Sequence, residues 1–465
     1  MDEIENVTEK EKKDGSESEI RLQTPFGPIT LDAEKARGAW SKAQNDKSGP
    51  TNLAQAYEEG YIGGSTGGVS KFWPQCFGEK VMLVLDDYIS CEWETERISH
   101  FIMRGNKEVM PNYRIVEAGD GVTKDVPIEA VRLICRKDDP QRRMVLVNSL
   151  DHDGDIRLTA KFSKENRGLA KDFLDNLEDF FFENGPMRGT VFDGNMTFLP
   201  RHSGASERLI MAKGVREKVS RHLTGFLSVM HQAEDFGISS NRGVILSGPP
   251  GTGKTLLVRY IIEKTDLTVI CLSPSQINRG TISTFYRMAR KLGPCLVVLE
   301  DIDSAGGLHR KIRDHPILGE VLESLDGISD NAGVVTLATT NYLENIDDAL
   351  RDRPGRFDRI IQVPVPDADS RKRMIEKMGP EFGIGSWLDA DWLSKETVGF
   401  TGDWLRNLMQ TSKLIALQRG SEEIAKRDLE EALVDIDDNR MIAYQSTPEL
   451  PRPDARRRVS QGSYA

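Results

Sequence analysis

The sequence predicts an α/β fold: a core with a doubly wound parallel sheet, a small helical domain after it and a mixed α/β domain before it. Strands and helices alternate from about residue 242 to 366, which is typical of parallel sheets whose strands are joined by helices. The stretch "GPPGTGKT" stands between an apolar strand, "GVILS", and a helix, "TLLVRYIIEK". After "VPVPDAD" the pattern becomes helical up to about residue 439, so we expect a hinge at Pro364–Pro366.

Composition shifts divide the chain into five segments. Residues 1–20 are charged throughout, and we expect a disordered tail without a secretory signal. Residues 21–200 form the mixed α/β domain, which we expect to bind a client or partner. The core covers 205–366 and the helical domain 367–440. Residues 446–465 carry prolines and an arginine cluster, which indicate a solvated tail or, alternatively, a docking tag.

Two stretches of the N-terminal domain have a clear local pattern. "RMVLVNSLDHDGDIRLTAKF" from Arg143 predicts two strands around a turn at Asp153-Gly154. Its "DHDGD" is no calcium loop, because Gly154 comes too early in it and Phe162 stands where the last glutamate ligand belongs. A helix with Phe173 and Leu177 at helical spacing is predicted from about Lys164 to Glu183. The glycine-rich "GYIGGSTGG" lacks a following Lys-Thr and is interpreted as a loop.

Bulk composition excludes several classes of protein. The net charge of -11 argues against broad nucleic-acid binding, because phosphate backbones require a basic face. The five cysteines are scattered without a C-x-x-C pair, which argues against a zinc site or a disulfide framework and fits a reducing compartment. No apolar run is long enough for a membrane span. We therefore expect a cytoplasmic protein.

The stretch "GPPGTGKT" fits the pattern G-x-x-x-x-G-K-[ST] of a phosphate-binding loop completely. Its glycines let backbone N–H groups point at phosphate oxygens, and the following helix N-terminus adds partial positive charge. Lys254 would bridge the β- and γ-phosphates, and Thr255 would ligate Mg²⁺. The candidate nucleotide-binding residues are Gly248, Pro249, Pro250, Gly251, Thr252, Gly253, Lys254 and Thr255.

Two acidic residues follow the second apolar strand after the phosphate loop. Leu296–Leu299 is a continuous apolar run, and Glu300 and Asp301 follow it. Ligands of open α/β sheets bind at the carboxyl ends of the strands, so both acids should face the phosphate loop. By position Glu300 takes the metal role and Asp301 acts as the base on the attacking water, with Asp303 in support. The usual order of such a pair is Asp-Glu.

These motifs, with those downstream, resemble the AAA group of ATPases over about residues 205 to 438. "VTLATTN" ends in Asn341, which corresponds to the polar residue called sensor 1. "RPGRFDR" supplies Arg353 and Arg356, which correspond to fingers that reach the nucleotide of a neighbouring subunit. "TVGFTGDWLRNLM" is similar to the lid segment, with Gly402 at the nucleotide. The resemblance implies ATP and Mg²⁺ as cofactors and a homo-oligomeric ring, most often a hexamer.

Three departures from the family pattern bear on function. The Glu-Asp order also occurs in the mitochondrial AAA translocase that handles the Rieske protein, an active ATPase. The segment after the second strand reads Ile277-Asn278-Arg279-Gly280, without the aromatic residue that grips threaded polypeptides in many AAA unfoldases. The lid reads Gly402-Asp403-Trp404 where Gly-Ala-Asp is usual. The lead-in "FFENGPMRGTVFDGNMTFLPR" resembles that of some bacterial AAA proteins.

Three functions are consistent with this pattern. The first is a ring ATPase that couples hydrolysis to remodelling of a protein client. The alternative is a nucleotide-gated assembly scaffold or switch, with slow turnover and no threading. A nucleic-acid motor is the third, and the acidic charge and the lack of an aromatic-basic stacking surface weigh against it.

Overall fold

The computed structural model of the chain divides into two compact units, Met1–Gly185 and Pro186–Ala465. It describes residues 19–24, 27–32, 53–64, 66–102, 107–236, 241–277, 280–304, 320–321, 323–325, 333–347, 350, 357–384 and 387–446. The boundary differs from the one expected near residue 200, because the short strand β10 (Val191–Asp193) pairs with the core sheet. The expected tails also differ: Glu19 already lies in β1, and α15 extends through Ser446.

The N-terminal unit is built on an antiparallel sheet. Its order is β3-β9-β8-β7-β4-β5, with β6 paired to β7, and β1 and β2 form a separate hairpin. The strands are β1 (Glu19–Thr24), β2 (Gly27–Asp32), β3 (Gly67–Trp73), β4 (Trp93–Ile102), β5 (Lys107–Val109), β6 (Asn112–Gly119), β7 (Val122–Arg136), β8 (Arg143–Leu150) and β9 (Ile156–Phe162). The helices are α2 (Leu53–Ile62), α3 (Gln75–Glu92), η1 (Lys164–Asn166) and α4 (Arg167–Asn184).

Helices cover both faces of this sheet. Tyr57 and Tyr61 of α2 pack on Val131 and its neighbours, whereas Arg132 turns to the other face and bonds to Asp86 of α3, 2.8 Å between Nε and Oδ1. Phe173 of α4 meets the ring of Trp93 on the side of α3. The predicted hairpin and the predicted helix are both confirmed.

The turn between β8 and β9 uses its acids internally. Gly154 has φ +86°, a conformation that favours glycine. The Asp151 carboxylate accepts hydrogen bonds from the backbone N–H groups of Asp153 and Asp155, at 3.0 and 2.9 Å. These contacts confirm a structural turn at the place where "DHDGD" superficially resembles a calcium loop.

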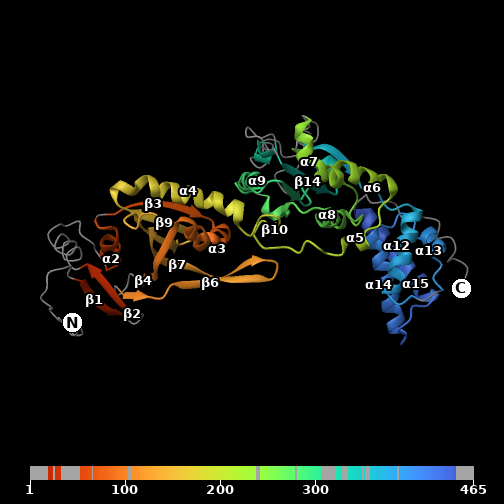
Figure 1. Cartoon of the computed structure of the whole chain (residues 1–465). Coiled ribbons are helices and arrows are strands. Elements are labelled where there is room, and N and C mark those ends of the chain that lie inside the picture. Colours follow the sequence, from red (N-terminus) through yellow and green to blue (C-terminus); the bar gives the residue numbers. More distant parts are fainter. Residues whose placement is uncertain are drawn as a thin grey trace, which may run out of the picture. The chain divides into compact units, whose positions relative to one another are not determined.

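The second unit contains the predicted parallel sheet, in the order β10-β12-β13-β14-β11-β15. Figure 1 labels two of these strands, β10 and β14. Its remaining strands are β11 (Arg242–Ser247), β12 (Thr268–Leu272), β13 (Cys295–Leu299), β14 (Val334–Thr340) and β15 (Phe357–Gln362). Its helical elements are α5 (Ala205–Arg208), α6 (Lys213–Val219), η2 (Ser220–Thr224), α7 (Gly225–Asp235), α8 (Lys254–Glu263), η3 (Pro274–Gln276), α9 (Thr281–Lys291) and η4 (Leu343–Asn345). All strand pairs are parallel, as a doubly wound fold requires.

Four helices make the lid, drawn in blue in Figure 1: α12 (Ala368–Glu381), α13 (Ala390–Glu396), α14 (Gly402–Gln418) and α15 (Lys426–Ser446). They enclose a separate apolar core around Phe400, Leu405 and Leu408. Asp367, Asp389 and Thr401 cap the first three helices by accepting backbone hydrogen bonds, which fixes where each helix begins. The lid thus has its own core and joins the sheet through Val363–Pro366.

Candidate nucleotide-binding site

The loop from Gly248 to Thr255 connects the end of β11 to the start of α8. A side chain on Gly248 would place its Cβ 2.1 Å from the carbonyl oxygen of Val363, so only glycine fits there. Gly251 and Gly253 have φ values of +76° and +90°. Sterics and backbone conformation therefore both explain the glycines of the motif.

Lys254 is almost fully buried, with 6% of its surface exposed. Its ammonium donates to the carbonyl oxygens of Gly248 (2.7 Å) and Pro249 (3.0 Å) and to Oδ1 of Asn341 (2.7 Å). Burial lowers the pKa of Lys254, and the negative charges of Asp301, Asp303 and Asp403 oppose that shift. The lysine is thus held against the loop by acceptors that phosphate oxygens can replace.

Glu300 lies on the sheet face that carries α8. Leu296 and Val298 of β13 belong to one buried cluster with α8, and Glu300 continues their alternation at the end of the strand. Burial raises the pKa of Glu300, Asp301 raises it further, and Arg259 of α8 opposes the shift. Thr255 lies one helical turn before Arg259, so Thr255 and Glu300 belong to the same face of the sheet.

Asp301 has an unusual backbone, with φ +43°. Its N–H donates to Oγ1 of Thr339 on β14, at 2.8 Å, and the N–H of Ile302 donates to the carbonyl of the same threonine, at 2.9 Å. Asp301 acts electrostatically on Lys254, whereas the positive charge that acts on Glu300 is that of Arg259. The two acids therefore have separate surroundings, Asp301 toward the loop lysine and Glu300 toward α8.

Asn341 links the two halves of the site. Besides accepting from Lys254, its backbone N–H donates to Oδ1 of Asp303, at 3.2 Å. The structure thus brings together the phosphate loop, the acids after β13 and the asparagine after β14, as the sequence predicts. Arg353 and Arg356 lie outside the described residues.

The lid completes the site through Gly402. The N–H of Asp403 donates to the carbonyl of Gly251, at 3.4 Å, and a Cβ on Gly402 would lie 3.6 Å from the same oxygen. Gly402 is therefore placed beside the phosphate loop, as expected from the family pattern.

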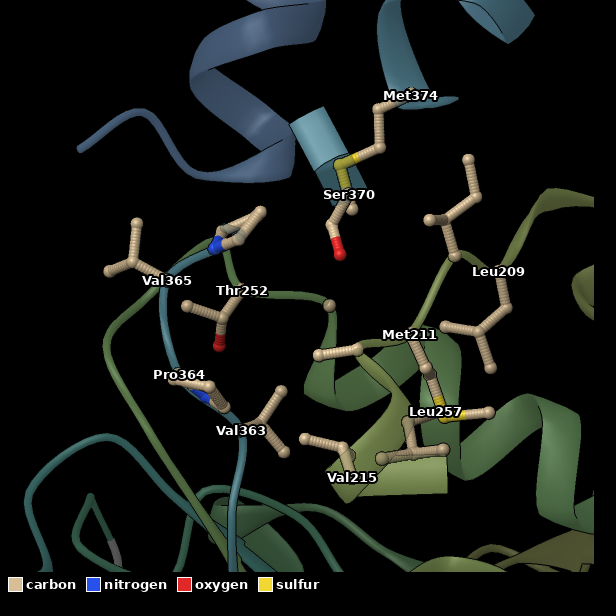
Figure 2. Close-up of a pocket in the computed structure, with 14 residues that line it drawn as sticks. Leu209, Met211, Val215, Thr252, Leu257, Val363, Pro364, Val365, Ser370 and Met374 are labelled. Carbon is tan, nitrogen blue, oxygen red and sulfur yellow. The ribbon is translucent and has the colours of Figure 1, made fainter. Parts of the chain in front are cut away.

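A small apolar hollow of about 30 Å³ opens next to the loop (Figure 2). Figure 2 shows Leu209, Met211 and Val215 on one side, Val363–Val365 on another, and Ser370 and Met374 of the lid above. Thr252 and Gly253 form its border with the phosphate loop. Sequence reasoning missed this hollow, although the apolar run "LIMA" before α6 was a usable signal.

The residues present fit a nucleotide with magnesium. A loop of backbone N–H groups at a helix N-terminus suits a phosphate chain, and the apolar side chains beside it are of the kind that line nucleoside sites. Among the described residues, no group of three or more His, Cys, Asp or Glu side chains could hold a metal alone. Mg²⁺ needs no such cage, because it binds through one or two protein ligands and substrate phosphates. Thr255 and Glu300 are the ligands that this site offers.

Comparison with known proteins defines the class. Residues 244–365 match the family described as "ATPase family associated with various cellular activities (AAA)". The chain therefore contains an AAA ATPase domain, whose family uses ATP and Mg²⁺.

The relatives found are similar to this domain and its lid. ATP-dependent zinc metalloprotease FtsH 3 of Sphaerobacter thermophilus is 34% identical over 229 residues, which are 47% of this chain and 46% of the relative. ATP-dependent zinc metalloprotease YME1L1 of Homo sapiens is 31% identical over 232 residues, 47% of this chain and 30% of the relative. The chain thus spans less than half the length of these relatives. Among the helices that the structure describes, none has the length and apolar character needed to cross a membrane.

Proposed function

We propose that this protein is a Mg²⁺-dependent ATPase that works as a homo-oligomeric, hexameric ring and remodels a protein client. The contact network that joins Lys254, Asn341 and Asp303 supports the proposal most directly. In this network a lysine, an amide and a carboxylate meet at the carboxyl ends of adjacent strands, an arrangement suited to nucleotide hydrolysis.

Each residue has a defined task in this proposal. Backbone N–H groups of the loop and Lys254 would bind the phosphates, and Thr255 and Glu300 would hold Mg²⁺. Asp301 orients the attacking water and takes its proton, and Asn341 positions both Lys254 and that water. When bound, ATP supplies the bond that is broken and Mg²⁺ neutralises its charge. Arg353 and Arg356 would act on the nucleotide of a neighbouring subunit.

Client binding is assigned to the N-terminal unit, Met1–Gly185. This unit is compact in itself and lies outside the matched family region. A cytoplasmic location is part of the same proposal, and the five free cysteines support a reducing compartment. Crosslinks between a trapped client and residues of this unit would support the assignment, and crosslinks confined to the second unit would contradict it.

The first test measures ATP turnover and oligomeric state together. Full-length protein is compared with Lys254→Ala, by phosphate release and by light scattering, with and without ATP and Mg²⁺. We expect an ATP-dependent ring with turnover that the variant lacks. A hexamer with no turnover above the Lys254→Ala control would contradict the proposal.

The same test distinguishes the proposed function from the alternative one. A ring that assembles on ATP, turns over slowly and leaves a tagged client folded would favour the nucleotide-gated scaffold. The absence of an aromatic residue between Ile277 and Gly280 motivates this alternative. Tight binding of single-stranded DNA at physiological salt would instead favour a nucleic-acid motor.

A further inference from the structure

The first turn of lid helix α14 lies directly on the phosphate loop. Thr401 caps this helix by accepting from the N–H of Trp404, at 3.4 Å. A Cβ built on Gly251 would lie 2.8 Å from Oγ1 of Thr401 and 3.1 Å from Oδ2 of Asp403. Asp403 therefore packs against the loop at Gly251, although the residue as a whole is exposed.

Asp403 contacts the phosphate loop from the lid at a point outside the apolar hollow. The lid residues that line the apolar hollow are Ser370 and Met374, and Asp403 is not among its lining residues. Partial burial raises the pKa of Asp403, whereas the charges of Arg406 and Lys254 lower it. Asp403 thus shares its electrostatic surroundings with the lysine that receives phosphate.

Three carboxylates act on Lys254. They belong to Asp301, Asp303 and Asp403. The first two are fixed to β14 and its following residue by hydrogen bonds, but Asp403 belongs to the lid. A carboxylate at this position repels a phosphate chain, and the repulsion grows with the negative charge of the chain. The lid can relieve it by withdrawing from Gly251.

We propose that Asp403 is a specificity-determining residue. While the lid contacts the phosphate loop, the Asp403 carboxylate disfavours a bound nucleoside triphosphate more than a bound diphosphate. The inference rests on the proposed nucleotide binding and adds a charge-dependent lid. The family's lid segment usually has alanine at this position, so the negative charge in the lid is a feature of this chain. Bound Mg²⁺ offsets part of the phosphate charge, which makes the discrimination depend on the metal.

The test measures dissociation constants of the full-length protein for ADP and for the non-hydrolysable β,γ-imido analogue of ATP. Asp403→Asn removes the charge and keeps the size, Asp403→Ala removes both, and Glu430→Ala removes one charge from the lid surface on α15 as a control. We expect both Asp403 variants to bind the triphosphate analogue about tenfold more tightly than the wild type, with a change of at most about threefold for ADP. The gain should be larger in EDTA than in Mg²⁺ and should shrink at high salt.

Hydrogen exchange of the α14 first turn gives a second measure. In the wild type the triphosphate analogue should expose the amides of Gly402–Trp404 more than ADP does, and in Asp403→Asn the two nucleotides should protect them equally. Two results would overturn this inference and leave the proposed function standing. One is an equal change of affinity for both nucleotides, and the other is a gain in affinity for the triphosphate analogue in Asp403→Ala that Asp403→Asn lacks. A wild type that binds nucleotide no better than Lys254→Ala would overturn it together with the proposed function.

Discussion

At the scale of single residues, the backbone of Asp301 decides which substitutions the site tolerates. A φ of +43° lies in the left-handed region, which aspartate and asparagine adopt more readily than other residues with a side chain. The N–H of Asp301 also donates to Thr339, so its conformation is fixed from β14. Asparagine can therefore replace Asp301 without disturbing the backbone, whereas alanine adds strain.

We predict that Asp301→Asn abolishes ATP turnover and spares ATP binding. The amide cannot accept the proton of the attacking water, and general-base catalysis typically contributes 10²–10⁴-fold. Turnover should fall at least about 100-fold, while the dissociation constant for ATP stays within about twofold. Phosphate release and equilibrium binding measure the two quantities. If Glu300→Gln alone shows this behaviour, the roles of the two acids are exchanged.

A matched pair of glycine substitutions separates backbone strain from contact with the lid. Gly251 and Gly253 both have positive φ, but a Cβ on Gly253 meets nothing within 4 Å, whereas one on Gly251 meets Thr401 and Asp403. Both alanine variants should lose about 1 kcal/mol of unfolding free energy from backbone conformation. Gly251→Ala should in addition speed hydrogen exchange at the start of α14, and equal exchange in the two variants would contradict the described contact.

At the scale of elements, two side chains fasten the lead-in segment to helix α8. The Arg201 guanidinium donates to four backbone carbonyls around the end of α8, including Gly189 at 2.9 Å and Leu267 at 2.8 Å. The Glu263 carboxylate accepts five hydrogen bonds from the backbone and hydroxyl groups of 203–206. Helix α8 thus begins at the phosphate loop, and its other end is bonded to the lead-in segment.

We predict that Glu263 contributes stability that is lost in acid. Burial alone would raise its pKa, but hydrogen bonds from Ser206, Ala205 and Ser203 outweigh burial and hold the pKa far below the usual 4.5. A group whose folded pKa is depressed stabilises the fold above its unfolded pKa and loses that contribution as pH falls below it. Glu263→Gln should lower the free energy of unfolding by about 1–2 kcal/mol at neutral pH.

Urea unfolding between pH 7 and pH 3 measures this effect. The difference between wild type and Glu263→Gln should narrow as the pH falls below about 4.5. Exposed Glu430→Gln serves as the control, and its difference from the wild type should stay near zero throughout. A Glu263→Gln difference that does not change with pH would show that the carboxylate charge is not what fastens the segment.

The elements that the sequence predicts are those with strong local signals. The phosphate loop, the apolar strand before Glu300 and Asn341 each carry a motif whose chemistry requires a fixed place in the sheet. The edge strand β10 was missed because its three residues, "VFD", are too short for periodicity and pair with β12 only after folding. The neighbourhood of Arg259 was missed because it depends on contacts between distant segments, whereas Asp403 already stands out in the sequence as a departure from the usual lid segment.

At the scale of the whole molecule, the proposed ring requires each site to be completed by a neighbour. Lys254 and the acids come from one subunit, and Arg356 would come from the next. An arginine that stabilises the transition state of phosphoryl transfer is worth about 10³–10⁵-fold in rate. We therefore predict that Arg356→Ala nearly abolishes turnover in the homo-oligomer and leaves nucleotide binding within about twofold of the wild type.

Mixing two inactive variants tests whether the arginine acts between subunits. Arg356→Ala retains its own phosphate loop, and Lys254→Ala retains its arginine, so a mixed ring contains some sites with both residues intact. Turnover should reappear on mixing and reach a maximum at intermediate ratios, because only junctions of one order are complete. Each variant alone, at the same total concentration, is the control. A mixture that stays inactive although light scattering shows mixed rings would place Arg356 outside the catalytic site of the neighbour.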